Sequence, residues 1–309
     1  MEGLLFVQRA AAPHISVCIC TYRRPNLLTR LLTELCDQET NGLFTYSIVV
    51  ADNDIARSAE PVVSEFRAKS PIVITYCVEP QQSIARARNK AVANAQGEFL
   101  AFIDDDEFPI RSWLLRLFQT CKKHDADGVL GPVRRHFDQC PPRWIANSQL
   151  YERPINATGV IVSWPEARTG NVLLRASIFA NNVNPFRPEF RAGEDQDFFR
   201  REIGRGRTFI WSAEATVYEV VPPVRWKRSY MLRKALLRGA MARLQPTCGF
   251  VSIAKSIIAI PAYLVVLPIA VIMGHNHFMS LLIRVFDHLG KLLALVGMNP
   301  IREEYIQER

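Results

Sequence analysis

Several familiar ligand-binding signatures are missing from this 309-residue sequence. It has neither the GxxxxGK(S/T) loop that cradles phosphates nor the GxGxxG turn of dinucleotide-binding folds. It also has no CxxC pair, and its acidic residues do not follow the spacing of an EF-hand calcium loop. These motifs are therefore excluded, and a bound phosphate would need a metal ion to neutralise much of its charge.

Cysteine gives no sign of a disulfide framework. The seven cysteines are irregularly spaced, and their odd number argues against complete pairing. Cys18 and Cys20 lie in an apolar run and are interpreted as small core residues. We therefore expect a reducing, cytosolic environment, and the first fourteen residues lack the pattern of a signal peptide.

Acidic residues are absent from a long stretch near the C-terminus. Residues 221–286 contain no Asp or Glu but nine Lys and Arg, in a chain of formal net charge +8. Residues 256–274 carry no charge and reach the lower length limit of a membrane-spanning helix, although Pro261 and Pro268 interrupt them. Three hypotheses stay open: a membrane hairpin, two helices lying in the lipid headgroup layer, or a soluble helical extension. Basic residues beside an apolar segment fit an anionic leaflet, so we expect contact with the inner membrane surface, on the cytoplasmic face of the cell membrane.

Buried strands alternate with helical patterns at the start of the chain. The expected strands are 15–20, 46–53, 72–78 and 97–103, and the expected helices cover 27–35 and 83–95. This alternation predicts an α/β fold with a parallel sheet. In such sheets, ligands bind outside the carboxyl ends of the strands.

Polar residues directly follow three of these strands. They are residues 21–23 (TYR), 52–54 (DND) and 104–106 (DDD), and we expect them to converge at one edge of the sheet. The last group, extended by Glu107, suits a hard cation such as Mg²⁺ or Mn²⁺. A solvated acidic loop is the ordinary interpretation of any one group, but three at one edge favour a ligand site.

A second acidic cluster lies in the segment FRAGEDQDFFRREIGRG. We predict a helix from about Asp195 to Ile203 that ends at Gly204, with Phe199 facing inward. Acidic residues such as Glu194 are common at helix N-termini, where they interact favourably with the helix dipole. The functional alternative is that one of these carboxylates is a catalytic base.

Together these segments resemble glycosyltransferase family 2, the inverting enzymes with the nucleotide-diphospho-sugar transferase (GT-A) fold. The resemblance covers roughly residues 15–242 and rests on the order of ISVCICTYRRP, IVVADND, SIARARNKAVANAQGEFLAFIDDDEFP with its DxD motif, TGNVLLRASIF and FRAGEDQDFFRR. Asp54 stands where the family often has Gly. Within the family the sequence is most similar to bacterial succinoglycan-type exopolysaccharide glucosyltransferases.

The resemblance implies a mixed sheet with flanking helices. It implies an N-terminal extension at residues 1–14, a GT-A domain at 15–242, and hydrophobic, membrane-associated helices at 243–309.

Basic charge also permits nucleic-acid binding, but no recognised motif accompanies it, so no nucleic-acid partner is expected. The sequence makes no prediction of the oligomeric state.

The resemblance also assigns a nucleotide site. Thr21 and Tyr22 would lie against the nucleotide, with Arg23 in the same loop. Asp52 would accept a hydrogen bond from the uracil ring, which gives a preference for UDP. Arg88 would hold the nucleotide side of the site, near the DxD motif.

The catalytic and metal-binding roles fall to the two acidic clusters. Asp104 and Asp106 form the DxD pair, with Asp104 toward the ribose and metal, Asp106 as the firmest ligand of Mg²⁺ or Mn²⁺, and Asp105 in the same nucleotide-sugar site. Asp195 would be the general base, with Glu194 positioning the acceptor or the loop. Inversion then needs one base and one metal but no enzymic nucleophile.

One family feature is absent at its expected place. Many members carry a late His that reaches the metal or the diphosphate, whereas this sequence has Tyr218 and Glu219 in that neighbourhood. Glu219 could reach a metal but would repel a diphosphate. Contact with the diphosphate falls instead to Arg225, Lys227 or Arg228, and the alternative is that these are ordinary surface residues.

The leading hypothesis is a metal-dependent transferase that moves a hexose from a UDP-sugar to a lipid-linked saccharide in exopolysaccharide synthesis. The alternative is a catalytically silent, membrane-bound scaffold of a polysaccharide assembly complex. A sugar-phosphate nucleotidyltransferase ranks last, because the loop TYRRPN lacks the glycines of that class.

Overall fold

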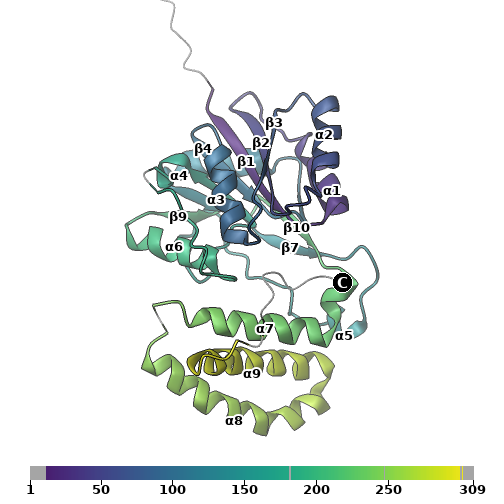
Figure 1. Ribbon diagram of the computed structural model, residues 1–309, viewed down its shortest axis with the longest axis vertical. Coiled ribbons are helices and arrows are strands. Elements are labelled where there is room, and N and C mark those ends of the chain that lie inside the picture. The colour runs from purple at the N-terminus through teal and green to yellow at the C-terminus, as the bar shows by residue number, and fades with distance from the viewer. Residues whose placement is uncertain (1–11, 181, 247, 300, 302–309) are drawn as a thin grey trace, which may run out of the picture.

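A mixed seven-stranded sheet organises the first two thirds of the chain (Figure 1). The computed structural model describes residues 12–180, 182–246, 248–299 and 301, so nearly all of the expected extension at 1–14 lies outside the described residues. The strand order is β3 (Ile74–Val78), β2 (Thr45–Asp52), β1 (His14–Thr21), β4 (Phe99–Ile103), β8 (Asn171–Arg175), β6 (Gly128–Leu130) and β9 (Phe209–Trp211).

The direction of β8 makes the sheet mixed. The first four strands are parallel, as the alternating pattern predicted, but β8 runs antiparallel to both β4 and β6. Asn171 pairs with Ile103, so the chain enters β8 at the carboxyl end of β4. A strand that starts there can only return against its neighbour, and the start of β8 therefore lies beside the acidic turn.

Helices cover both faces of the sheet. A buried core lies between the sheet and the helices on each face. The first core contains α1 (Pro25–Leu35), α2 (Glu60–Lys69) and α4 (Trp113–His124), and the second contains α3 (Ile84–Asn94) and α6 (Glu194–Gly204). The side chains of β1 alternate between the two cores, with Val17 in the first and Cys18 in the second. The predicted helix at 195–203 is confirmed, and Phe199 is fully buried.

A small second sheet lies beside the acidic turn. Its order is β5 (Glu107–Pro109), β10 (Val217–Val220) and β7 (Val133–His136). Glu219 of β10 pairs with Glu107 of β5, and the ring of Tyr218 stacks on Phe108. The stretch where the family often has a His therefore does reach the acidic cluster.

Three long helices stack below the sheet domain (Figure 1). The short helix α5 (Arg143–Ala146) and a 3₁₀ turn, η2 (Pro223–Trp226), precede α7 (Arg228–Ala242), α8 (Phe250–Met273) and α9 (His275–Leu295), and another 3₁₀ turn, η1 (Ala176–Ile178), follows β8. The order from the sheet domain outward is α7, α9, α8. Pro261 and Pro268 do not end α8, which curves instead. Among the described residues, α8 is the one helix that is long and apolar enough to cross a membrane.

Two glycines let α7 and α9 approach closely. A Cβ at Gly239 would come within 2.0 Å of the Asp287 carbonyl oxygen, and one at Gly290 within 2.2 Å of the Leu236 carbonyl oxygen. We expect Gly290→Ala to lower the free energy of unfolding by about 1–3 kcal/mol, since overpacking forces the helices apart. Urea unfolding measures it, with Gly204→Ala as the control because nothing lies within 4 Å of that position. An unchanged midpoint for Gly290→Ala would contradict the close approach.

Candidate active site

The turn after β4 carries the first acidic cluster. It is closed by a hydrogen bond from the Glu107 N–H to the Asp104 carbonyl, and the Asp104 N–H donates to the Glu107 carboxylate at 3.2 Å. Asp105, Asp106 and Glu107 are buried. Of the four acids, Asp104 alone keeps an accessible side chain, which is 42% exposed.

The buried aspartates are held by cations from two distant segments. Asp105 accepts hydrogen bonds from the Thr21 hydroxyl at 2.8 Å and from Arg24 at 2.9 Å. Asp106 accepts from Arg24 at 3.2 Å and from Arg225 of η2, and both bonds fall on its Oδ2 atom. The loop after β1 and the turn after β10 are therefore tied to the same acidic turn.

The environment shifts the pKa values of these carboxyls in different directions. Burial opposes ionisation of Asp106, but the charges of Arg225 and Arg24 outweigh it and lower its pKa. For Asp105 burial prevails over Arg24 and raises the pKa to about 6. Burial, together with the neighbouring carboxylates, raises the pKa of Glu107 well above its usual value. Perturbed acids of this kind are typical of functional sites.

Arg88 joins the two acidic clusters. This buried arginine of α3 donates to Asp104 at 3.2 Å and also to Glu194 at the start of α6. Ser83 caps the N-terminus of α3 by accepting from the Arg86 N–H, which starts the helix that presents Arg88. Because one guanidinium bridges both carboxylates, clusters that are far apart in the sequence meet in space.

The three acids in the first turn of α6 have different surroundings. Glu194 is buried against Arg88, and Asp197 is fully buried in ion pairs with two arginines of the same helix at 2.8 and 2.9 Å. Asp195 is only partly buried, accepts a hydrogen bond from the Gln196 N–H at 2.8 Å, and makes no ion pair with any described residue. Gly193 precedes the helix at φ 81°, a left-handed conformation that favours glycine. Asp195 is thus the most accessible of the three carboxylates.

The Asp52 carboxylate accepts hydrogen bonds from groups within the protein. It is fully buried and accepts from the Ala59 N–H at 2.8 Å, the Asp54 N–H at 3.1 Å and the Tyr76 hydroxyl at 2.9 Å. Thr21 pairs with Asp52 across β1 and β2, so the two strand ends do converge. The contact of Asp52 with a uracil ring stays a prediction.

The rest of the expected nucleotide loop lies at this strand edge. Arg23 forms an ion pair with Asp54 at 3.0 Å, and its guanidinium lies 5.1 Å from the centre of the Tyr22 ring. The aspartate that replaces the usual glycine therefore anchors this loop. Nucleotide binding by Thr21, Tyr22 and Arg23 stays a prediction.

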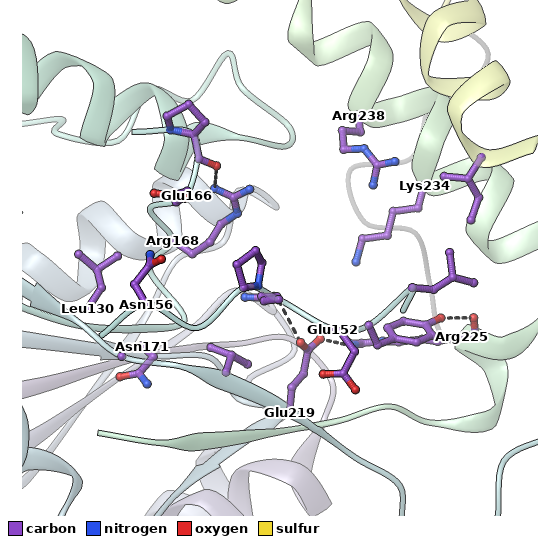
Figure 2. A pocket seen from close by; sticks show the side chains of 18 of the residues that line it. Leu130, Glu152, Asn156, Glu166, Arg168, Asn171, Glu219, Arg225, Lys234 and Arg238 are labelled. Carbon is purple, nitrogen blue, oxygen red and sulfur yellow. Dashed lines mark hydrogen bonds and ion pairs between the residues drawn. The ribbon is translucent and has the colours of Figure 1, made fainter. Parts of the chain in front are cut away.

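A cleft lies between the sheet domain and the helices α7 and α9. It consists of two adjoining cavities of about 630 and 610 Å³, which share residues such as Arg153, Arg168 and Lys234. The 610 Å³ cavity is lined by Asp104, Glu194 and Asp195, and the 630 Å³ cavity by Glu219 (Figure 2). The accessible members of both acidic clusters therefore face one space.

Basic residues line much of this cleft, and most were missed from the sequence. Glu219 binds Arg153 at 3.0 Å and Arg225 at 2.7 Å, so Arg225 reaches the site, whereas Lys227 and Arg228 are exposed and line neither cavity. The acid-free stretch was a signal for the basic residues of α7. The segment that carries Arg153 and Arg168 has no periodic pattern that reveals them.

Comparison with known proteins places the chain in a family. Residues 16–180 match the family model described as glycosyl transferase family 2. The chain belongs to glycosyltransferase family 2. It is 36% identical over 232 residues to the succinoglycan biosynthesis protein ExoM of Rhizobium meliloti (strain 1021), an alignment that covers 73% of each chain. The family predicted from the motifs is confirmed, and the protein is a glycosyltransferase.

More distant relatives support the same family and fold. The chain is 22% identical to the poly(ribitol-phosphate) beta-glucosyltransferase of Bacillus spizizenii, over 67% of this chain and 32% of that protein. The mannosyltransferase PcManGT from Pyrobaculum calidifontis, in complex with GDP-Man and Mn²⁺, superimposes with a TM-score of 0.65 at 16% identity, covering 94% of this chain and 89% of that one. S. aureus TarS 1–349 in complex with UDP-GlcNAc gives 0.55 at 15% identity, covering 93% of each chain. The GT-A fold with a mixed sheet is confirmed.

Proposed function

We propose that this family 2 enzyme moves a hexose from a UDP-sugar to a saccharide acceptor, with inversion, in bacterial exopolysaccharide synthesis. The observation that carries the proposal is the meeting of Asp104 and Asp195 in one cleft. The similarity to a succinoglycan biosynthesis protein supports the pathway, and the likeness to a UDP-GlcNAc complex supports the donor class.

Asp195 acts as the base in this proposal. It accepts the proton of the acceptor hydroxyl while that oxygen attacks the anomeric carbon. The new glycosidic bond forms as the bond from the anomeric carbon to the diphosphate breaks, and UDP leaves with the electron pair. One displacement inverts the configuration. Arg88 holds Glu194, and with it the first turn of α6, in position beside the DxD turn.

The DxD carboxylates are the candidate ligands of a divalent cation, Mg²⁺ or Mn²⁺, in this proposal. A Cβ at Gly170 would lie 3.2 Å from Asp104 Oδ2, so the missing side chain keeps that oxygen accessible. Both arginine bonds to Asp106 fall on Oδ2, and Oδ1 accepts no hydrogen bond from the described residues. Asp104 and Asp106 would each offer a hard oxygen ligand. When bound, the ion would stabilise the charge of the leaving diphosphate as a Lewis acid.

We expect UDP binding to require both Mn²⁺ and Asp104. Chelation, or the variant Asp104→Asn, should weaken UDP binding by at least about tenfold, since a charge-assisted contact is worth about 1.5–3 kcal/mol. Isothermal titration calorimetry measures it, with Asp125→Asn as the control because that side chain is 94% exposed. UDP binding that depends on neither the metal nor Asp104 would contradict the proposed donor site. UDP binding without turnover across many acceptors would favour the silent scaffold.

A membrane-bound location is part of the proposal. Only 11% of the most apolar stretch of α8 is buried, and large side chains such as Val265 (76%) and Ile272 (87%) are exposed. The helix does not project from the protein but runs along α9, where His288 bonds Ser256 at 2.9 Å. This arrangement favours a helix that lies in the headgroup layer of the cytoplasmic leaflet, with exposed Lys255 among anionic lipids. Such a position suits a lipid-linked acceptor.

We expect Val265→Glu with Ile272→Glu to lower partition into vesicles that contain phosphatidylglycerol. The fall should be at least about tenfold, because each buried apolar side chain contributes about 1.5–3 kcal/mol. Vesicle sedimentation measures it. Val73→Glu is the matched control, since Val73 is 68% exposed on the sheet domain. Equal partition of all three proteins would contradict the proposal, and resistance to alkaline extraction would favour a spanning helix.

A further inference from the structure

Two of the basic side chains that face the cleft make no ion pair with a described acidic residue. Among the described residues, Arg168 donates only to the carbonyls of Pro165 and Ala167, and Lys234 makes no ion pair but lies 5.8 Å from the centre of the Tyr230 ring. Figure 2 shows the two on different sides of the cavity, Arg168 on a loop and Lys234 on α7, with Arg238 one turn along. This group, Arg168, Lys234 and Arg238, is called the basic wall below.

The positive charge of the basic wall is only partly compensated. Arg238 pairs with Asp287 at 2.5 Å, but Arg168 and Lys234 have no such partner among the described residues. Burial lowers the pKa of the Arg168 guanidinium; Asp195 opposes this, and the nearby Arg153 and Arg238 add to it. Like charges gathered in a cavity repel one another, and an anionic ligand would remove that cost.

The basic wall lines both cavities. The 610 Å³ cavity is lined by Asp104, Asp195 and the basic wall, whereas the 630 Å³ cavity is lined by the basic wall but by neither aspartate. The acceptor hydroxyl must lie beside Asp195 if that residue is the base. The remainder of the acceptor can then pass the basic wall into the 630 Å³ cavity, whose size is typical of ligand pockets.

We propose that the basic wall binds an anionic oxygen group, a phosphate or a carboxylate, carried by the acceptor close to the hydroxyl that reacts. This inference rests on the proposed function, because Asp195 defines where the hydroxyl lies. Two sources supply such a group: the diphosphate of a short lipid-linked saccharide, or an acidic sugar within the saccharide. Either group would form charge-assisted hydrogen bonds with a cation of the basic wall, Lys234 on one side of the cavity or Arg168 on the other.

Calorimetry with the full chain tests the proposal, in saturating UDP and Mn²⁺ so that the donor site is filled. The probes are geranyl diphosphate, cellobiouronic acid and, as a neutral match, cellobiose. We expect one anionic probe to bind and to lose at least about tenfold in affinity in Lys234→Met, because a hydrogen bond to a charged group is lost. Lys227→Met is the matched control, since Lys227 is exposed outside both cavities. Arg168→Gln provides a second variant, and thermal unfolding checks that each variant is folded.

The outcomes separate the two sources and the two proposals. Binding of geranyl diphosphate identifies a lipid diphosphate, and binding of cellobiouronic acid but not cellobiose identifies an acidic sugar. The proposal is overturned if neither anion binds, or if Lys234→Met weakens UDP itself, which would assign the basic wall to the donor. If UDP does not bind the wild type while an anionic probe still depends on Lys234, the proposed function fails and the anion site stands.

Discussion

Replacing Asp195 with Asn is expected to lower kcat for sugar transfer by about 10³-fold, within the range of about 10²–10⁴ that a general base contributes. The amide keeps the size of the side chain but cannot accept the proton of the acceptor hydroxyl. UDP affinity should stay unchanged, because Asp195 pairs with no described residue of the DxD turn. Transfer from the UDP-sugar to a lipid extract measures kcat, and calorimetry measures UDP binding.

The control for this experiment is Asp37→Asn. Asp37 is 71% exposed and pairs only at the surface with Arg111, so its loss should leave kcat unchanged. A kcat for Asp195→Asn within about threefold of wild type would assign the base elsewhere, because even a modest general base contributes about 100-fold. Glu194 would not be the obvious substitute, since Arg88 occupies its carboxylate.

Replacing Asp106 with Asn should lower the free energy of unfolding by about 3 kcal/mol, besides weakening the donor site. Removing one partner of a buried ion pair leaves an uncompensated charge, which typically costs about 3–5 kcal/mol. We expect the lower value because, in the variant, Arg225 would still pair with Glu219 and Arg24 with Asp105. Urea unfolding followed by circular dichroism measures the change.

Asp138→Asn is the matched control for Asp106. Asp138 is 52% exposed and pairs with Arg30 at 2.9 Å, so its loss should change the free energy of unfolding by less than about 1 kcal/mol. Asp104→Asn should also be mild, because that carboxylate is partly exposed. If Asp106→Asn unfolds at the wild-type urea concentration, its pairing with Arg225 is not structural.

The elements around the site were predictable because their signals are local. Buried β-branched runs predict strands, and polar residues at their ends mark the edge where ligands bind. Thr21 and Asp52 are accordingly adjacent across β1 and β2. The antiparallel β8 was not predictable from the alternation, since its direction depends on where the preceding loop enters the sheet.

Only the fold shows which of these acids are buried and paired and which is accessible. The sequence marked Asp104, Asp105 and Asp106 alike, and only packing against Arg24 and Arg225 separates two buried, paired acids from one accessible acid. Likewise, the ion pair between Arg88 and Glu194 joins segments with no sequence relation. Ion pairs are made across space, and a linear pattern does not record them.

By itself the sequence determined the family, the first four strands of the sheet, the helices α1, α3 and α6, the two acidic clusters and the apolar segment near the C-terminus. Periodicity and motif spacing are properties of neighbouring residues, so they survive without the fold. The tertiary structure decided that Asp195 is the accessible acid of α6, that α8 lies along α9, and that Arg168 and Lys234 face one cleft. Burial and charge compensation depend on which distant segments pack together, and only three-dimensional packing sets that.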